Sequence, residues 1–349
     1  MTNEDVTPPP VKMRQLGQTG LEVTELSLGG LFLSKFGGEF EQSRAAALRA
    51  FELGINYVDT APTYGNSEEV LGRILREAGA RSAGAPLILS TKLGGRPQPF
   101  QPHDKGGLRQ SVEESLRVLG RGQVDILFVH EPDRPGQYDW WTRSPMWEAN
   151  AELAGPVLEL LDDLKREGII RFTGLGGTTA HQLACLVDTG KFDVVLTAFN
   201  YSLLWREAEH EVLPAAKRHG MGVVIGSPLQ QGALSRRYDD EVNGGAPWLS
   251  LPRRNQLKAL YALLDELEMS IVELALRFVL SNPDISCTLT GARSAAEVER
   301  NVAYAEKGPL PKDVLKRLDA IAAMVPFRPC EERPTLCFGW TGYKGPGSL

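Results

Sequence analysis

One stretch decides the fold: Leu87-Ile88-Leu89-Ser90-Thr91 is followed by a helical pattern from Leu108 to Leu119 and then by Asp125-Ile126-Leu127-Phe128-Val129. Both short runs are apolar on successive residues. This pattern is typical of parallel strands that are covered on both faces. The stretch therefore predicts a strand-helix-strand unit in a parallel sheet.

The same alternation extends in both directions along the chain and gives eight strand-helix pairs. The predicted strands are 25–29, 56–59, 87–91, 125–129, 171–175, 194–199, 222–226 and 287–290. The predicted helices are 43–53, 68–77, 108–119, 156–167, 180–188, 207–219, 271–280 and 294–305. No linker or change of composition divides the chain, so the fold class is α/β, a (β/α)₈ TIM barrel, rather than a doubly wound sheet with a second domain.

We expect a single domain over residues 1–349, with a barrel core of about 24–305. Several segments stand outside the repeat. They are a flexible start (1–11), a hairpin (12–23), long loops after the fourth and seventh strands (131–151 and 230–256), a last helix (312–324) and a tail (325–349). Connections in βα units are usually about 2 to 6 residues long. The two long loops and the tail could reach the mouth of the barrel and form the walls of a pocket; for the tail, packing on the barrel for stability alone stays open.

Composition excludes several classes of protein. Lys and Arg total 38 against 44 Asp and Glu, which gives a net charge of −6, and no basic run suggests binding to nucleic acid. No apolar stretch predicts a membrane span or a signal sequence, so we expect a cytoplasmic protein with no membrane partner. Cys185, Cys287, Cys330 and Cys337 lack the spacing of a zinc site, and whether Cys330 and Cys337 pair stays open.

Polar residues at strand ends carry the chemistry. In such barrels the active site lies at the carboxyl ends of the strands. Asp59 closes the second strand, Lys92 follows the third, His130 closes the fourth, and Tyr64 lies five residues beyond Asp59. Adjacent strands are about 5 Å apart, so these side chains can converge. A Tyr beside a Lys that is paired with an Asp is a plausible proton donor, and we expect the ammonium to lower the Tyr64 pKa towards neutrality.

These residues also carry a resemblance. The stretches Asp59-Thr60-Ala61-Pro62-Thr63-Tyr64-Gly65-Asn66-Ser67-Glu68, Leu89-Ser90-Thr91-Lys92 and Asp125-Ile126-Leu127-Phe128-Val129-His130 resemble the signatures of the aldo-keto reductase superfamily. The similarity runs from about Met13 to Ala305. It implies an NAD(P)-dependent oxidoreductase in which Tyr64 is the general acid/base, Lys92 and Asp59 tune it, and His130 orients a substrate carbonyl.

The histidines outside the catalytic group have no mutual ligand spacing, so no metal is expected. The resemblance also implies a set of cofactor-binding residues. They are Gly30, Tyr201, Ser227, Pro228, Leu229, Gly232, Leu234, Gly291, Arg293, Ser294, Glu297 and Asn301. Tyr201 matches the aromatic residue stacked on the nicotinamide. Arg293 can pair with a 2′-phosphate, whereas Glu297 would repel it, so we expect the protein to use both NADP and NAD.

The sequence departs from the family pattern at the nicotinamide carboxamide. Many members carry Ser-Asn after the fifth strand and a Gln before the matching Tyr, where this chain has Gly176-Gly177 and Ala198. These changes resemble the branch of bacterial sugar dehydrogenases for fucose, galactose and D-threo-aldoses. The predicted function is an aldose dehydrogenase or small aldehyde reductase.

Two alternatives stay open. Tyr138, Trp140, Trp141 and Trp147 suggest bulkier aromatic aldehydes, and some superfamily members are nicotinamide-binding regulatory subunits with slow turnover. The partner is expected to be a small carbonyl compound or sugar. Direction, exact substrate and oligomeric state are not readable from the sequence.

Overall fold

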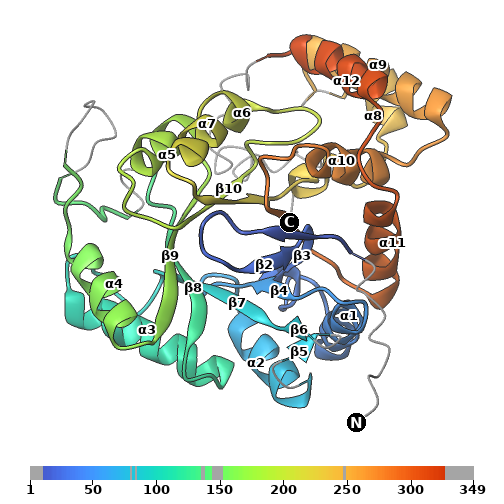
Figure 1. The fold of residues 1–349 in the computed structure, drawn as a ribbon. Coiled ribbons are helices and arrows are strands. Elements are labelled where there is room, and N and C mark those ends of the chain that lie inside the picture. The colour runs from blue at the N-terminus through green and yellow to red at the C-terminus, as the bar shows by residue number, and fades with distance from the viewer. Residues whose placement is uncertain are drawn as a thin grey trace.

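Eight parallel strands close into a barrel at the centre of the computed structural model (Figure 1). The structure describes residues 11–78, 81–82, 85–134, 138–143, 152–246 and 249–326. The barrel strands are β3 (Leu26–Gly29), β4 (Tyr57–Asp59), β7 (Ile88–Leu93), β8 (Val124–His130), β9 (Ile170–Gly177), β10 (Val194–Ala198), β11 (Gly222–Gly226) and β12 (Cys287–Thr290). Pairing of Thr288 with Leu26 closes the barrel, so the predicted (β/α)₈ fold is confirmed.

Helices form a ring around these strands (Figure 1). They are α1 (Phe40–Glu52), α2 (Ser67–Ala78), α3 (Lys105–Leu119), α4 (Pro156–Arg166), α5 (Ala180–Val187), α6 (Glu207–His210), α7 (Val212–Arg218), α10 (Ile271–Leu280) and α11 (Ala295–Glu306). Local sequence sets their ends: Asp104 accepts a bond from the Gly106 amide at the start of α3, and Gly120 ends it with φ of +66°. The single helix predicted at 207–219 is wrong, because Glu211 breaks it with φ of −124° and ψ of −62°.

A hairpin closes the amino end of the barrel. Its strands are β1 (Met13–Gln15) and β2 (Glu22–Thr24), and the turn between them packs on the start of β11, where the Gln18 amide donates to the Gly220 carbonyl. The hairpin contributes three side chains to the core inside the barrel, Leu16, Leu21 and Val23. Apolar side chains therefore fill the barrel from below, and the polar residues lie towards its carboxyl end.

The insertion after β11, predicted as a long loop at 230–256, is largely helical. It contains α8 (Asp239–Gly244) and α9 (Leu251–Leu267), and α9 packs beside α12 (Lys312–Ala323) (Figure 1). Ser250 caps α9 by accepting a bond from the Arg253 amide, and Leu257, Leu260 and Leu264 are buried along one face. Two short 3₁₀ turns, η1 (Gly30–Phe32) and η2 (Gln230–Gly232), and a small hairpin, β5 (Arg81–Ser82) with β6 (Ala85–Pro86), complete the fold.

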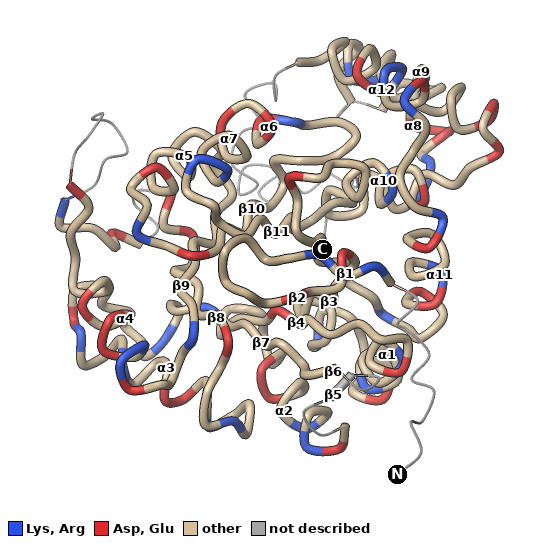
Figure 2. Tube along the Cα trace, in the orientation of Figure 1, with Lys and Arg blue, Asp and Glu red and all other residues tan. Residues whose placement is uncertain are grey.

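Charged residues of both signs are interspersed over the outer helices, whereas most of the barrel trace is uncharged (Figure 2). Among the described residues, no helix combines the length and the apolar character that a bilayer crossing needs. Several predictions fall outside the described residues: the flexible start up to residue 10, and Trp147, Cys330 and Cys337.

Candidate active site

The structure brings the four predicted catalytic side chains together at the carboxyl end of the barrel. Asp59 is the last residue of β4, Lys92 lies in β7, and His130 is the last residue of β8. Asp59 and Lys92 are each 2% exposed and His130 is 9% exposed. Tyr64 lies in the loop between β4 and α2. The site is thus assembled by three consecutive strands of the barrel.

Lys92 is the centre of the group. Its Nζ forms an ion pair with Asp59, donates to the Thr60 carbonyl at 2.9 Å and lies 4.6 Å from the centroid of the Tyr64 ring. Burial lowers the pKa of Lys92, but the negative charge of Asp59 and the interactions with Tyr64 more than compensate, so the pKa is raised overall. Lys92 therefore stays charged although it is buried.

Tyr64 does not have the near-neutral pKa that we predicted. Burial raises the pKa of Tyr64 above its ordinary value of 10, and the ammonium of Lys92 offsets only part of this rise. Lys92 lowers the Tyr64 pKa, as predicted. However, burial of the phenolate destabilises the charged form by more than the Lys92 ammonium stabilises it. Tyr64 is consequently protonated at neutral pH, the state in which it can donate a proton.

The loop that carries Tyr64 is fixed at its far end by Ser67. The Ser67 hydroxyl donates to the Gly30 carbonyl at 2.7 Å and lies 2.8 Å from the Thr60 hydroxyl. A side chain at Gly30 would collide with this loop, since its Cβ would lie 2.5 Å from the Asp59 carbonyl oxygen. Gly30 therefore permits the close approach of β3 and β4 beneath Tyr64.

His130 is neutral. Burial, followed by the positive charges of Lys92 and Arg134, holds the pKa of His130 well below its usual value of 6.5. Its Nδ1 lies 3.3 Å from the Thr63 hydroxyl, and its ring meets the Tyr64 ring edge-on at 5.8 Å. The Trp140 indole donates to the His130 carbonyl at 3.0 Å. A neutral imidazole held in this way can orient a carbonyl oxygen without carrying charge.

Two supporting groups were missed by sequence reasoning. Ser90 donates to Asp59 Oδ1 at 2.7 Å and lies 2.9 Å from the Tyr57 hydroxyl. The sequence contained a signal for both residues, because side chains two positions apart on a strand face the same side of the sheet. Ser90 lies two residues before Lys92, and Tyr57 lies two residues before Asp59. These hydroxyls orient the carboxylate from inside the barrel.

The second missed group lies outside the barrel wall. Glu68, at 1% exposure, accepts a bond of 2.6 Å from the Thr91 hydroxyl and pairs with Arg96. Thr91 is the neighbour of Lys92 on β7. Glu68 therefore ties the start of α2, just beyond Tyr64, to the strand that carries Lys92.

The first predicted cofactor segment follows β11. Ser227 has φ of +54°, and Gly232 has φ of +102° at the end of η2. Gln230 holds the segment by donating to the Phe199 carbonyl at 2.9 Å and to the Ser202 hydroxyl at 2.9 Å. Ser227 and Leu229 are half-buried and Pro228 is buried, whereas Leu234 is completely buried and is a core residue. The strained turn lies at the carboxyl end, where it can wrap a diphosphate.

The second cofactor segment opens α11. Ser294 caps the helix by accepting a bond from the Glu297 amide at 3.3 Å, and Glu297 accepts a bond from the Arg293 amide at 2.8 Å. The exposed Arg293 guanidinium lies 4.6 Å from the Phe32 ring centroid. Gly291 is packed against the same ring, and Asn301 is buried on α11. A helix start with a nearby guanidinium fits the phosphate of a dinucleotide.

Tyr201 is not at this site, and the predicted stacking on nicotinamide is wrong. Its ring is 3% exposed and stacks on Phe278 of α10, with centroids 5.2 Å apart. Its hydroxyl accepts a bond from Asn282, just beyond the end of α10, and burial raises the pKa of Tyr201 to about 12. Both partners belong to the outer helical layer, so Tyr201 is a packing residue.

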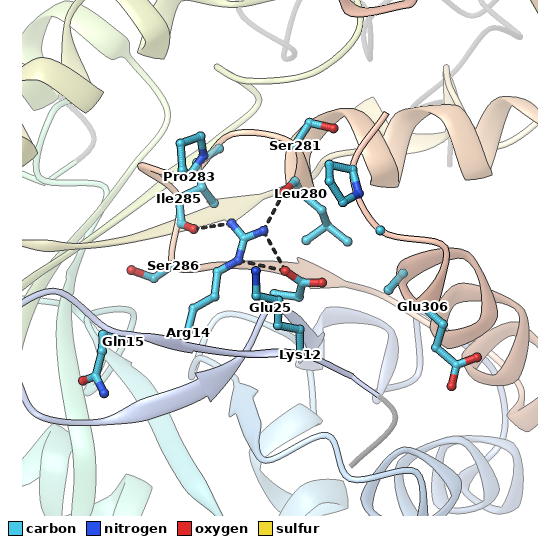
Figure 3. Close-up of a pocket in the computed structure, with 13 residues that line it drawn as sticks. Lys12, Arg14, Gln15, Glu25, Leu280, Ser281, Pro283, Ile285, Ser286 and Glu306 are labelled. Atoms are coloured by element: carbon cyan, nitrogen blue, oxygen red, sulfur yellow. Dashed lines mark hydrogen bonds and ion pairs between the residues drawn. The ribbon is translucent and has the colours of Figure 1, made fainter. Parts of the chain in front are cut away.

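A cavity of about 610 Å³ lies at the opposite, amino end of the barrel, between the hairpin and the ends of α10 and α11 (Figure 3). Its main cation, Arg14, pairs with Glu25 and donates to the carbonyls of Leu280, Asn282 and Ile285. These bonds occupy the guanidinium. The cavity is therefore bordered by a structural anchor and is separate from the candidate active site. Within the described residues, no cluster of three potential metal ligands is found.

Comparisons with known proteins agree with this geometry. The profile of the Aldo/keto reductase family matches residues 25–323. An L-galactose dehydrogenase from Arabidopsis thaliana is 32% identical over 300 residues, which cover 84% of this chain and 88% of that protein. A pyridoxal 4-dehydrogenase from Microbacterium luteolum is 30% identical over 329 residues, which cover 84% of this chain and 93% of that protein.

A solved structure is also similar. The holo form of an aldo-keto reductase from Bacillus halodurans superimposes with a TM-score of 0.71 at 28% identity, covering 92% of this chain and all of that one. The family match spans most of the chain and includes every strand that contributes a candidate catalytic residue. This chain therefore belongs to the aldo/keto reductase family of oxidoreductases.

Proposed function

We propose that the protein interconverts a carbonyl and an alcohol with NADP or NAD as cofactor. The observation that carries the proposal is the buried pair of Lys92 and Asp59 beside Tyr64, with a neutral His130 across from it. A bound nicotinamide would supply or accept the hydride. Tyr64 would give a proton to the carbonyl oxygen in reduction and take it back in oxidation. Lys92 lowers the cost of the phenolate, and His130 orients the oxygen.

The substrate class that we favour is an aldose or a related cyclic hemiacetal. L-galactose and pyridoxal, the compounds named in two relatives, both close into cyclic hemiacetals in water. Oxidation of the hemiacetal hydroxyl would give a lactone: the phenolate form of Tyr64 would accept the hydroxyl proton, while the C–H bond at the same carbon breaks and its hydride passes to the oxidised nicotinamide. Small aldehydes would be reduced at the same site in the opposite direction.

Bulkier aromatic aldehydes are less well supported. Trp140 and Trp141 are 0% and 6% exposed, and their indoles donate to the carbonyls of His130 and Pro132. The Tyr138 ring packs against Phe100 with centroids 5.1 Å apart. These rings are committed to packing and backbone contacts, so they stabilise the loop beside His130 rather than offer a surface to a substrate.

The helix start at Arg293 bears on cofactor choice. The guanidinium is exposed on the Phe32 ring, where a 2′-phosphate could pair with it, while the carboxylate of Glu297 lies at the same helix start. The two charges oppose each other at the adenosine end. We propose that both dinucleotides are used.

A steady-state screen tests the proposal. Aldoses, small aldehydes and aromatic aldehydes are assayed in both directions with NAD and NADP, following the absorbance of the reduced nicotinamide, with the Tyr64→Phe variant in parallel. Turnover that requires Tyr64 supports the proposal. Tight cofactor binding without turnover on any substrate would instead favour a nicotinamide-binding regulatory subunit.

A further inference from the structure

Thr63 contacts the imidazole of His130 and lies outside the group of four catalytic side chains. Its hydroxyl lies 3.3 Å from Nδ1 of His130 and has no other hydrogen-bond partner among the described residues. The next residue in the chain is Tyr64, whose amide donates to the Ala61 carbonyl at 3.1 Å and closes a turn that contains Thr63. One turn therefore carries both the proposed proton donor and the hydroxyl that meets the imidazole.

Packing against Gly95 sets the direction of the Thr63 hydroxyl. A Cβ at Gly95 would lie 2.5 Å from the γ-methyl of Thr63, and Gly95 has φ of +81°, so the methyl group occupies space that only a glycine leaves free. A β-branched side chain has few χ1 rotamers, so a fixed methyl group also fixes the hydroxyl. The preceding residue, Gly94, lies against His130, since a Cβ there would be 3.6 Å from the His130 Cβ. Thr63 and His130 thus meet beside two glycines that follow β7.

The proton on the His130 ring can lie on either nitrogen. Burial holds the pKa of His130 well below its usual value, so at neutral pH one ring nitrogen is a donor and the other is an acceptor. A carbonyl oxygen only accepts hydrogen bonds, so the nitrogen that faces a substrate must carry the proton. Thr63 lies at Nδ1, which leaves Nε2 for the substrate.

The direction of the bond between Thr63 and His130 follows from this division. A hydroxyl can donate or accept, and the Thr63 proton has no competing side-chain or backbone acceptor among the described residues. We infer that Thr63 is a positioning residue whose hydroxyl donates to Nδ1 of His130 and so keeps the ring proton on Nε2, where it can bind the oxygen of a substrate carbonyl. The role in turnover rests on the proposed function, whereas the bond itself is a property of the protein without ligand.

Two variants separate the hydroxyl of Thr63 from its methyl group. Thr63→Val keeps the shape of the side chain but has no hydroxyl. Thr63→Ser keeps the hydroxyl but loses the methyl group that packs on Gly95. Thr63 is exposed, so neither variant opens a cavity in the core. The matched control is Thr142→Val, at an exposed threonine in the loop after β8.

The first measurement is ¹⁵N–¹H NMR of the ring nitrogens in protein labelled at histidine, at pH 8 and without cofactor. His130→Asn assigns the signals of His130. In the wild-type protein we expect the proton on Nε2 and an Nδ1 signal that is shifted by an accepted hydrogen bond. In Thr63→Val the Nδ1 signal should move to that of a nitrogen without a donor, and part of the proton should return to Nδ1. Thr63→Ser and Thr142→Val should keep the wild-type pattern.

The second measurement is steady-state kinetics with an aldehyde that the wild-type protein reduces. The kcat of Thr63→Val should fall about two- to tenfold, the usual contribution of one hydrogen bond, while the dissociation constant of the cofactor keeps its wild-type value. Thr63→Ser should restore most of the lost kcat, because it restores the donor. Thr142→Val should have the wild-type kcat.

The outcomes separate this inference from the proposed function. A proton on Nδ1 in the wild-type protein would mean that Thr63 accepts the bond, and an unchanged Nδ1 signal in Thr63→Val would mean that the bond is absent; either result overturns the inference. A wild-type kcat in Thr63→Val also overturns it. The wild-type spectrum decides the direction of the bond even where Thr63→Val fails to fold. If the wild-type protein turns over no carbonyl compound, the proposed function is wrong, and the spectra still decide whether Thr63 donates to His130.

Discussion

The Ser90 hydroxyl donates a 2.7 Å hydrogen bond to Oδ1 of Asp59, the same carboxylate that holds Lys92. Tyr57 lies 2.9 Å from the Ser90 oxygen and extends the chain of hydroxyls into the barrel. The orientation of Lys92 therefore depends on residues that never approach a substrate.

Ser90→Ala is expected to remove the donor from a buried carboxylate oxygen. We expect a loss of about 1 to 3 kcal/mol in the free energy of unfolding and a lower kcat, with cofactor affinity unchanged. Denaturant unfolding and steady-state kinetics measure both. Ser111→Ala is the matched control, because its buried hydroxyl has no partner among the described residues. Equal losses in the two variants would argue against a role for Ser90.

Tyr64→Phe is expected to lower turnover by about 10²- to 10⁴-fold, the usual contribution of a positioned acid or base. The ring, and with it the edge-on contact to His130, is retained. Cofactor dissociation constants should therefore stay at the wild-type value. Wild-type turnover in this variant, on a good substrate, would show that another group donates the proton.

Lys92→Met is expected to move the pH profile of alcohol oxidation to higher pH. Oxidation needs the Tyr64 phenolate; burial raises the pKa of Tyr64, and Lys92 is the main group that lowers it. Loss of the ammonium raises that pKa further, so the rate should rise only at more alkaline pH and reach a lower value at pH 8. The half-exposed surface lysine Lys105 serves as the control, because Lys105→Met should leave the profile in place.

His130 is expected to make stability depend on pH. Its folded-state pKa lies well below the unfolded value of about 6.5, chiefly because of burial, so the unfolded state binds the proton first. The contribution is fully present above pH 6.5 and is lost as the pH falls from there towards the folded-state pKa. Thermal melts from pH 8 to 5 should show a smaller acid loss in His130→Asn than in the wild-type protein. His210→Asn, at an exposed position, is the control and should lose stability with falling pH as much as the wild-type protein does. If His210→Asn reduces this loss as much as His130→Asn does, His130 is not its cause.

Arg293→Ala is expected to weaken NADP more than NAD, because only NADP has a 2′-phosphate. Glu297→Arg should shift preference towards NADP, although it also removes the acceptor of the Arg293 amide and so weakens the start of α11. In the wild-type protein we expect the two kcat/KM values to differ by less than about 100-fold, or about 2.7 kcal/mol. Equal losses of both cofactors in Arg293→Ala would mean that Arg293 does not read the 2′ position.

Most of the barrel was predictable because each strand is a short apolar run between helical patterns. β11 and β12 begin and end at the predicted residues, and the strand ends located Asp59 and His130. The helix α9 was missed although its signals were present: Ser250 as a cap and a buried face of leucines. α9 lies between β11 and α10, where the strand-helix alternation predicts only a connecting loop, so the search for the repeat left this helix out.

The errors at the site have a different origin. Pattern matching assigned Tyr201 a role on the cofactor, but only the packing against Phe278 shows that the ring faces an outer helix. The Tyr64 pKa depends mainly on how deeply the side chain is buried, and the spacing of residues in the sequence does not reveal this.

The hairpin that closes the amino end of the barrel also bears on the route by which the Tyr64 proton exchanges with solvent. Leu16, Leu21 and Val23 pack in the same apolar cluster as the Tyr57 ring, inside the barrel and towards its amino end. Because apolar side chains close that end, we expect a proton that leaves Tyr64 to exit at the carboxyl end, where the substrate arrives. A bound substrate would block access of solvent to Tyr64. We therefore expect the Tyr64 proton to exchange with solvent only after the substrate or product has dissociated.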